Sequence, residues 1–384
     1  MDFDLTSNQQ AARREFRDYV DEAVRPHAGE WDRAQCVPGE VIADLARRGY
    51  LGAGIDPKFG GRGFDQITTG MLTAEIARGC SSLRTLLTVH GALVAETLQR
   101  WGKDALKEAW LPRLAKGEKL AAFALSEAGS GSDAEAMATE YAVVDDGFEL
   151  SGTKKWTSYG QIADVVLTFA RGPKGVSAFL IETDSPGVEV RPIRGMLGTR
   201  ASMLAEITFD HCRVPADHLL GRAGWGFRQI AHTALDNGRY SVACGCLGII
   251  HAALEASIDY AGERQQFGRP IAQHQLVQRR LARMTATAQA VQLQCRQAGA
   301  AREAGEPMAV LLTNLAKYAA AAGAHQATDD ALQIHGAAGC HEGTAIERWY
   351  RDARVMEIIE GSTEMQEIMI GSSATAAFHH LFEA

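Results

Sequence analysis

The spacing of hydrophobic residues changes twice along this chain of 384 residues. In the first region, apolar side chains recur every three or four positions, as at Phe16, Tyr19 and Val20, which predicts helices joined by short turns. In the second, short runs of β-branched and aromatic residues between turns predict strands. After Gly226 the helical spacing returns. We therefore expect three domains, which span residues 1–118, 119–225 and 226–384.

Turn residues in the middle region indicate antiparallel pairing. The segment Asp145–Gly147 separates two strand-like runs, and Arg171–Gly175 separates two more. Short turns rich in glycine and aspartate between such runs are typical of β-hairpins. The region is therefore expected to form a central antiparallel β-barrel or sandwich.

Long alanine-rich stretches mark the last region. Residues 276–304 and 308–334 each read as one helix. Alanine faces let helices approach closely, so these stretches predict a C-terminal four-helix-type bundle or a subunit interface. Together with the N-terminal helical domain, the pattern predicts an α+β protein in the order helices, strands, helices.

Composition narrows the classes of function. The net charge of −8 argues against a nucleic-acid partner, because phosphate binding needs clustered positive charge. No apolar run approaches the roughly 20 residues that span a bilayer, and the acidic start Met1–Asp4 is unlike a secretory signal. We therefore expect a cytoplasmic protein with no membrane partner. The seven cysteines are scattered and form no metal-binding spacing, which predicts buried, reduced thiols and no metal site.

A carboxylate near the C-terminus is the strongest candidate for chemistry. Glu360 follows the apolar pair Ile358–Ile359 and precedes Gly361. Apolar neighbours raise the pKa of a carboxyl group, which makes it a usable base near neutral pH. Thr363 and Gln366 have the spacing of a capping box, so a helix is expected to begin just after the glycine. The alternative is an ordinary capped helix whose charged residues face solvent.

Two further segments have the composition of ligand-binding loops. In Ser126–Asp133, small residues and glycines would let a ligand reach backbone N–H groups. The alternative is a flexible domain linker. In Lys155–Gly160, Trp156 could pack on a flat aromatic ligand, with the neighbouring hydroxyls at its edge. The alternative there is a core tryptophan.

Five segments in this order resemble the signatures of the acyl-CoA dehydrogenase family of flavoproteins, over nearly the whole chain. They are Ser126–Asp133, Trp156–Ser158, Arg264–Gly268 with His274–Gln275, Gln333–Gly336 and Glu360–Thr363. The resemblance implies the acyl-CoA dehydrogenase-like fold, with FAD between the strand domain and the C-terminal helices. It also implies a homodimer or homotetramer, because the pyrophosphate and adenine end of FAD would be held across a subunit interface.

The resemblance assigns expected roles residue by residue. Ser126 and Ser132 would bond the flavin ring, Trp156 would pack beside it, and Ser158 would lie near the flavin N5. Arg264 and Phe267, with Gln333 and Gly336, would hold the pyrophosphate and adenine. The full set expected to bind the cofactor is Ser126, Ser132, Trp156, Thr157, Ser158, Arg264, Phe267, Gln275, Gln333, Gly336, Ser362 and Glu364.

The implied reaction is the α,β-oxidation of an acyl thioester. Glu360 would be the catalytic base that removes the α-proton, and the β-hydride would pass to flavin N5. The expected substrate-binding residues are Arg84, Asp236, Arg239 and Gly361. An acyl-CoA is the expected substrate, and an electron-transferring flavoprotein or a similar acceptor would take the electrons.

Two positions leave room for another substrate. Many relatives that use free CoA carry an arginine near position 372, where this chain has Ser372. Arg84 lies in an otherwise apolar helical segment, where it would either reach out to solvent or hold a polar group of the substrate. Glutaryl-CoA dehydrogenases resemble the chain here. The alternative function is oxidation of a short hydroxyacyl or carboxyacyl group on an acyl carrier protein in a polyketide-type pathway. A non-catalytic acyl- or flavin-binding scaffold is a third possibility, against which Glu360 argues.

Overall fold

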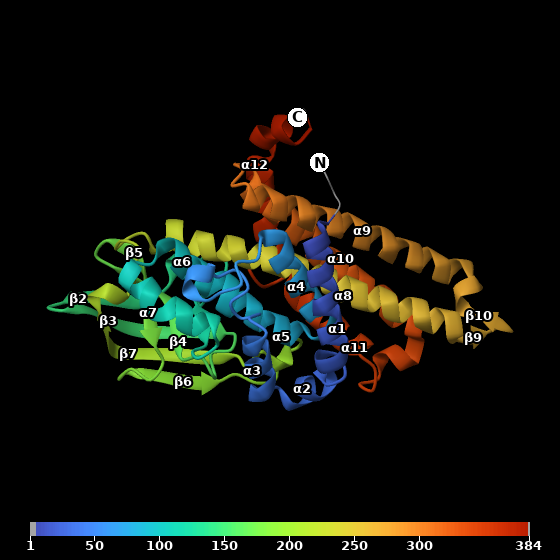
Figure 1. Ribbon diagram of the computed structural model, residues 1–384, viewed down its shortest axis with the longest axis horizontal. Helices are drawn as coiled ribbons and strands as arrows, with labels where there is room; N and C mark the ends of the chain where they lie inside the picture. The colour runs from blue at the N-terminus through green and yellow to red at the C-terminus, as the bar shows by residue number, and fades with distance from the viewer. Residues whose placement is uncertain (1–4, 383–384) are drawn as a thin grey trace.

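A computed structural model describes residues 5–382, and the side chains as far as residue 374. The chain runs through helices, a β-sheet and a second set of helices, with the sheet at one end of an elongated molecule (Figure 1). A π-helical segment, Leu87–Ala95, joins α5 to α6. The first helices are α1 (Ser7–Tyr19), α2 (Ala28–Ala34), α3 (Gly39–Arg47), α4 (Gln66–Gly79), α5 (Ser81–Leu86), α6 (Glu96–Trp101) and α7 (Asp104–Ala115).

The central sheet has the strand order β6-β7-β3-β2-β4-β5-β8 and is mainly antiparallel, although β1 and β2 both pair with β4 in parallel. Both predicted hairpins are confirmed: Val144 pairs with Gly147, and Gly172 pairs with Gly175. The strands are β1 (Ala121–Ala124), β2 (Glu140–Val144), β3 (Gly147–Thr157), β4 (Val165–Gly172), β5 (Gly175–Glu182), β6 (Val188–Pro192), β7 (Ala205–Pro215) and β8 (Leu219–Leu220).

Long helices form the second half of the chain. They are α8 (His232–Glu263), α9 (Gln275–Glu303), α10 (Ala309–His335), α11 (Ile346–Met356) and α12 (Thr363–Phe382), and a small hairpin of β9 (Gln265–Gln266) and β10 (Arg269–Pro270) joins α8 to α9. The alanine stripe of α10, which includes Ala316, Ala320 and Ala324, is fully buried. Small residues also let α8 touch α4, since a Cβ at Gly248 would lie 2.0 Å from the carbonyl oxygen of Ala74.

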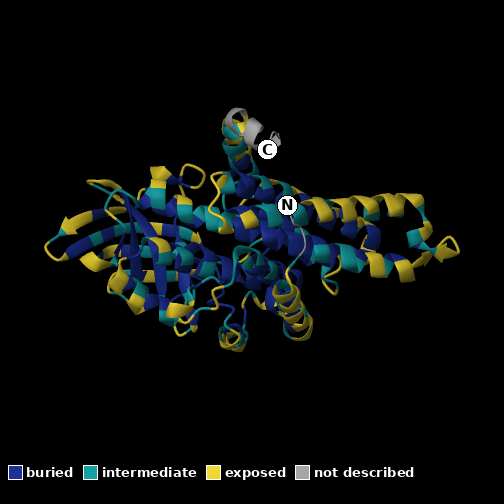
Figure 2. Cartoon of the chain, turned by 45° about the horizontal axis from the view of Figure 1, so that its top comes forward, coloured by how far each residue is buried: buried dark blue, intermediate teal, exposed yellow. Residues whose placement is uncertain are grey.

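Helix α8 is the central support of the fold. Figure 1 shows it running from the sheet toward the β9–β10 hairpin, and Figure 2 shows buried residues along the middle of the molecule and exposed ones on its outer helices. The segment Gly226–Glu263 is long and apolar enough to cross a membrane by length and composition, yet 72% of its most apolar window is buried inside the protein, as in a core helix.

Two local predictions were wrong. Cys36 and Cys340 are exposed rather than buried, although all seven thiols are free. Thr363 does not cap α12. Instead, Ser362 Oγ accepts a long hydrogen bond of 3.5 Å from the backbone N–H of Met365. The capping residue therefore lies one position earlier than the sequence spacing suggested.

Candidate active site

Glu360 lies in a tight turn between α11 and α12. Its φ is +55°, a left-handed conformation that is uncommon outside glycine, and Gly361 follows with a φ of +92°. Although Glu360 as a whole is only partly buried, its Oε2 atom is shielded from water and has no hydrogen-bond partner among the described residues. A strained turn therefore holds a carboxylate oxygen that the protein itself leaves unpaired.

Three side chains fix this turn through its backbone carbonyls rather than through the carboxylate. Arg239 Nε donates to the carbonyl oxygen of Glu360 at 3.1 Å, and Lys317 Nζ donates to that of Gly361 at 2.7 Å. The Gln366 amide donates to both carbonyls at 3.3 Å. The backbone is held while the carboxylate remains available.

The electrostatic surroundings set the basicity of Glu360. Burial raises its pKa to about 7, against the attraction of Arg239, Lys317 and Arg84. Burial likewise lowers the pKa of Lys317 to about 8, opposed by the nearby Cys246 and Glu360. A carboxylate with a pKa near the working pH is suited to general-base catalysis.

Arg84 does not reach solvent. Its side chain on α5 is fully buried, and burial lowers its pKa. Nη1 donates to Thr88 Oγ1 at 3.0 Å, Nη2 lies 3.2 Å from Met356 Sδ, and Nε has no partner among the described residues. No carboxylate in the described part of the chain forms an ion pair with it. The guanidinium is a buried cation without a counter-ion.

A buried ion pair anchors the loop that follows β1. Lys154 Nζ lies 2.7 Å from Glu127 Oε1, and the same carboxylate accepts hydrogen bonds from the backbone N–H groups of Ala138 and Thr139 at 2.6 and 3.0 Å. Burial opposes ionisation of Glu127, but the hydrogen bonds from Lys154, Thr139 and the backbone lower its pKa to about 2. This pair fixes the segment that carries Ser126, which is half-buried, and Ser132, which is exposed.

The end of β3 presents an aromatic surface. Trp156 has a φ of +65° and is 48% exposed, so it is not the core tryptophan that was the alternative. Thr157 Oγ1 is buried with no hydrogen-bond partner among the described residues, and Ser158 is half-buried. A half-exposed indole beside the unpaired hydroxyl of Thr157 fits a flat, polar-edged aromatic ligand.

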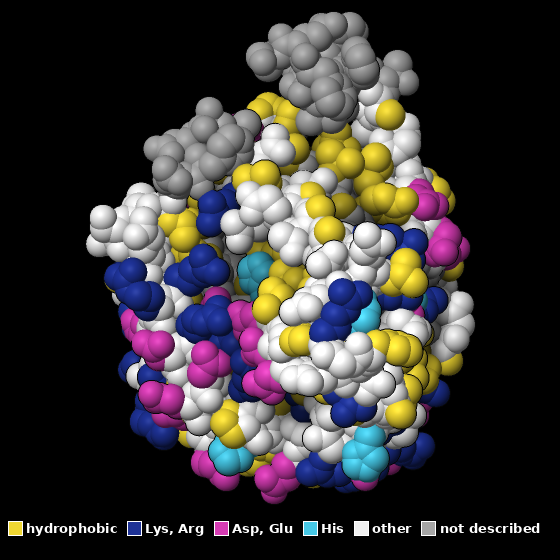
Figure 3. All heavy atoms as spheres, turned by 90° about the vertical axis from the view of Figure 1, so that its right-hand side faces the viewer, with side chains coloured by type: hydrophobic (Ala, Val, Ile, Leu, Met, Phe, Trp, Pro, Cys, Tyr) yellow, Lys and Arg dark blue, Asp and Glu magenta, His cyan; other side chains and the backbone are white. Residues whose placement is uncertain are grey.

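The other expected cofactor residues do not join this group. Arg264 and Phe267 lie on the β9–β10 hairpin, at the opposite end of the molecule from the sheet (Figure 1), and Phe267 is 94% exposed. Gln275 is also exposed there, as are Gln333 and Gly336 at the end of α10. Figure 3 faces this end, where hydrophobic side chains lie among charges of both signs. Residues 264 and 267 are therefore remote from Ser126 and Trp156 within one chain.

The remaining expected residues lie near Glu360 or on α8. Ser362 is half-buried, whereas Glu364 is exposed, with its pKa lowered by a hydrogen bond from Ser362. Asp236 Oδ2 is engaged by Arg302, which the sequence did not single out, whereas Asp236 Oδ1 is buried with no hydrogen-bond partner among the described residues. Lys317 was also missed. Its only sequence signal was that it is the one lysine or arginine in an alanine-rich helical stretch.

An open groove leads to Arg239. Its walls come from α6, the start of α8, α10 and α12, and it encloses about 1560 Å³ including space open to solvent. We call it the arginine groove, since Arg100, Arg228 and Arg239 are among its lining residues. It gives a long flexible ligand a path from the surface to the backbone of Glu360.

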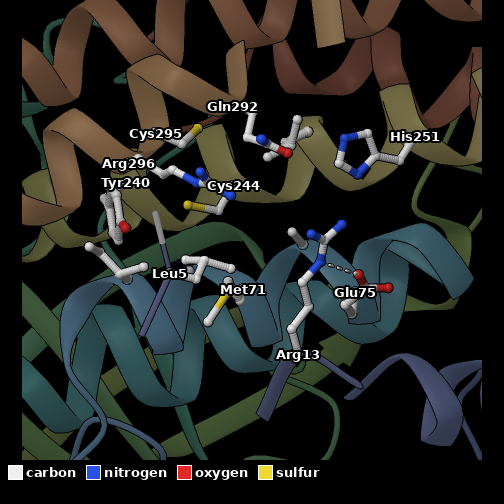
Figure 4. A pocket seen from close by; sticks show the side chains of 14 residues that line it. Leu5, Arg13, Met71, Glu75, Tyr240, Cys244, His251, Gln292, Cys295 and Arg296 are labelled. Atoms are coloured by element: carbon white, nitrogen blue, oxygen red, sulfur yellow. Dashed lines mark ion pairs between the residues drawn. The ribbon is translucent and has the colours of Figure 1, made fainter. Parts of the chain in front are cut away.

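A second pocket lies apart from this chemistry. It has a volume of about 490 Å³ between α1, α4, α8 and α9, and Figure 4 shows Tyr240, Cys244 and Cys295 on its α8 and α9 sides. Arg13 of α1 forms an ion pair at 3.7 Å with Glu75 of α4, beside it on the same side of the pocket. None of the expected site residues lines this pocket. Described residues also contain no group of three or more His, Cys, Asp or Glu side chains that could hold a metal ion.

Each of the three parts of the chain matches a domain model of one known protein family. The sequence models described as acyl-CoA dehydrogenase N-terminal, middle and C-terminal domains match residues 6–118, 122–212 and 224–375. An acryloyl-CoA reductase (NADH) of Anaerotignum propionicum is 36% identical over 96% of this chain and 95% of its own length.

Solved structures agree in fold. A glutaryl-coenzyme A dehydrogenase in complex with glutaryl-CoA superposes with a TM-score of 0.94 and 34% identity, over 98% of this chain and 97% of the other. FkbI, which serves biosynthesis of the methoxymalonyl extender unit of a polyketide, superposes with a TM-score of 0.88 and 34% identity, over 95% and 99%.

Proposed function

This chain belongs to the acyl-CoA dehydrogenase family, and we propose that it oxidises a short acyl thioester whose far end carries a carboxylate. Members of the family are flavin-dependent oxidoreductases that act on CH–CH bonds, and FAD is the cofactor. One observation carries the proposal: the unpaired carboxylate oxygen of Glu360 and the buried guanidinium of Arg84, which has no counter-ion, both lie against α8. A Cβ at Gly238 would lie 2.6 Å from Glu360 Oε2, and a Cβ at Gly245 would lie 2.9 Å from Arg84 Nε.

Glu360 is the base in this proposal. Its carboxylate takes the α-proton of the thioester, and the three surrounding cations stabilise the charged form before the reaction. Bound FAD supplies the acceptor of the β-hydrogen, which leaves as a hydride. Trp156, Thr157 and Ser158, with Ser126 and Ser132, would hold the flavin ring. Exclusion of water from Glu360 Oε2 keeps the base reactive.

Arg84 selects the acyl group. A cation that is fully buried without a counter-ion is costly, and a carboxylate arriving with the substrate would offset that cost. Thr88 already orients one end of the guanidinium, and its hydroxyl lies 2.8 Å from that of Ser241. The free Nε and the polar pair beside it favour an anionic or hydroxylated group over a plain alkyl chain.

A complete cofactor site needs two copies of the chain. The exposed Phe267 and the neighbouring Arg264 and Gln275 lie at the β9–β10 hairpin, at the opposite end of the molecule from the sheet that carries Trp156 (Figure 1). We propose that they hold the pyrophosphate and adenine end of the FAD bound mainly by another copy, in a homodimer or homotetramer. Electrons would then pass to an electron-transferring flavoprotein or a similar acceptor, in the cytoplasm.

A carrier-protein substrate is the second candidate. The likeness to FkbI, together with Ser372 in place of an arginine, favours a short hydroxyacyl or carboxyacyl group on an acyl carrier protein. The same base and cofactor would act on it.

Anaerobic bleaching of the flavin colour tests the function. Glutaryl-CoA, 3-hydroxybutyryl-CoA, butyryl-CoA and octanoyl-CoA, with the matching carrier-protein thioesters, would be mixed with the holoenzyme. We expect the carboxylated or hydroxylated substrates to bleach at the lowest concentrations, and Arg84→Met to lose this preference while Arg84→Lys retains part of it. Preferential bleaching by octanoyl thioesters, unchanged in Arg84→Met, would contradict the role of Arg84.

A further inference from the structure

The arginine groove has a local charge opposite to that of the whole protein. Arg100, Arg228 and Arg239 line it, whereas Asp236, the one acidic side chain among its described lining residues, is already paired with Arg302. The chain carries a net charge of −8. A groove with surplus positive charge on an acidic protein is suited to an anion.

Two of these arginines are available at the outer part of the groove. Arg100 and Arg228 are exposed, and neither forms an ion pair or a hydrogen bond with any described residue. The guanidinium of Arg100 lies over the ring of Trp101, 5.5 Å from its centroid. This cation–π contact holds the guanidinium in place with its N–H groups available to a ligand. A bidentate donor held in this way matches the geometry of a phosphate group.

The distance between the two ends of the groove matches a specific ligand. Arg228 lies in the π-helical segment Gly226–Ala231, which runs directly into α8. His232, Asp236 and Arg239 follow on α8 at spacings of four and three residues, which keep them on one face, and all four residues line the groove. Positions 228 and 239 are therefore separated by at most about 16 Å along the axis, the value for 11 residues of α-helix at about 1.5 Å per residue. Arg239 Nε donates to the backbone carbonyl oxygen of Glu360 at 3.1 Å, so this end of the groove adjoins the turn that carries the base.

A phosphopantetheine arm has this length. It has about 13 bonds between sulfur and phosphorus, and at roughly 3.5 Å for every three bonds of an extended peptide it reaches about 15 Å. With its thioester beside Glu360, its phosphate would lie beside Arg228. The walls between them, which include Thr233, Leu311 and Asn314, offer both apolar and hydrogen-bonding surface to the two amides of the arm.

We infer that Arg100 and Arg228 form a binding site for the phosphate of a phosphopantetheine thioester. This inference rests on the proposed function and deepens it. The site recognises a group that CoA and acyl carrier proteins share, and it does so without an arginine at position 372. The nucleotide of CoA is then not required for binding, because the phosphate at the end of the arm supplies the anionic contact.

The test removes the phosphate and the arginines in turn. Anaerobic bleaching would be titrated with one acyl group on pantetheine, phosphopantetheine, CoA and carrier protein, using the wild-type holoenzyme and the Arg100→Ala/Arg228→Ala variant. Arg222→Ala is the matched control, since Arg222 is an exposed arginine over Trp225 that does not line the groove. We expect acyl-phosphopantetheine to bind the wild type at least 10-fold more tightly than acyl-pantetheine, and the double variant to reduce this ratio to about twofold.

Each outcome decides the inference. Equal affinities for the two arms in the wild type, or an unchanged ratio in the double variant, would overturn the phosphate site while the proposed function stands. If no thioester bleaches the flavin, the proposed function fails, and calorimetric titration with phosphopantetheine and pantetheine themselves still decides the phosphate site. Comparison of CoA with carrier-protein thioesters then shows which source of the phosphate the enzyme prefers.

Discussion

The carboxylate of Glu360 occupies the space that a side chain at position 238 would fill. A Cβ atom on Gly238 would lie 2.6 Å from Glu360 Oε2, closer than such contacts are found in proteins. Glycine at this point of α8 therefore makes room for the base.

Replacing this glycine tests whether the position of the carboxylate matters. We expect Gly238→Ala to fold and to retain FAD, but to lose roughly 100-fold in the rate of flavin reduction, because the base is displaced by about 1 Å. Stopped-flow bleaching at saturating thioester measures this rate. Gly262→Ala is the control on the same helix, since nothing lies within 4 Å of a Cβ there. Equal rates in the two variants would remove the steric argument.

The pKa of Glu360 predicts the pH dependence of the reaction. Burial raises this pKa to about 7, and only the deprotonated carboxylate accepts a proton. The rate of flavin reduction is therefore expected to be low at pH 6, to rise through pH 7 and to level off at higher pH. Glu360→Gln should retain the yellow cofactor, react roughly 1000-fold more slowly and lose this pH profile. If the rate of flavin reduction keeps this pH dependence in the glutamine variant, the pH dependence belongs to a group other than Glu360.

The ion pair of Lys154 and Glu127 is expected to stabilise the loop that carries Ser126. Lys154→Met leaves the buried Glu127 carboxylate without its partner, which costs about 3–5 kcal/mol of unfolding free energy. Chemical denaturation and the FAD content after gel filtration measure the effect. Lys155→Met is the neighbouring control, because the Lys155–Glu206 pair, at 3.5 Å, is partly exposed and contributes about 1 kcal/mol or less. A similar loss in both variants would refute a special role for the buried pair.

His90 makes the fold sensitive to acid. Its ring is fully buried, accepts a hydrogen bond from the backbone N–H of Ala121 at 3.1 Å, and lies 3.1 Å from the carbonyl oxygen of Leu114. Burial lowers its pKa from 6.5 to about 4, so the folded state binds a proton less readily than the unfolded state.

The stability due to neutral His90 is therefore complete above pH 6.5 and is lost as the pH falls toward 4, by up to about 3 kcal/mol. Unfolding free energies at pH 7.5 and 5 measure the loss. His90→Gln should reduce this difference, whereas the exposed His341→Gln should not. If the unfolding free energies of His90→Gln at pH 7.5 and pH 5 differ as much as those of the wild type, another group causes the acid sensitivity.

Much of the architecture could be predicted from the sequence because it depends on local periodicity. The helical stretch 308–334 closely matches α10, and the turn at Asp145–Gly147 does join two paired strands. The surroundings of Glu360 could not be predicted in the same way. Lys317 lies 43 positions before it and Gly238 lies farther still, and only packing of α10 and α8 brings them together.

Arg84 shows a second limit of sequence reasoning. An arginine in an apolar helix reads equally well as exposed or buried, because the spacing does not reveal which side of the helix meets another. The structure buries it under Gly245, where a Cβ would lie 2.9 Å from its Nε. Arg264 and Phe267 show the opposite case. Their motif matches the family signature, but both residues are exposed in a single copy of the chain.

Helix α8 also constrains how this protein can evolve. The helix carries Gly238, which accommodates the base, and continues from the segment that carries Arg228. Insertion of a single residue between these two positions would turn Arg228 by about 100° around the axis and shift it by roughly 1.5 Å. Changes of substrate are therefore expected to arise by exchange of side chains along this stretch, while its length stays fixed in descendants that keep the activity.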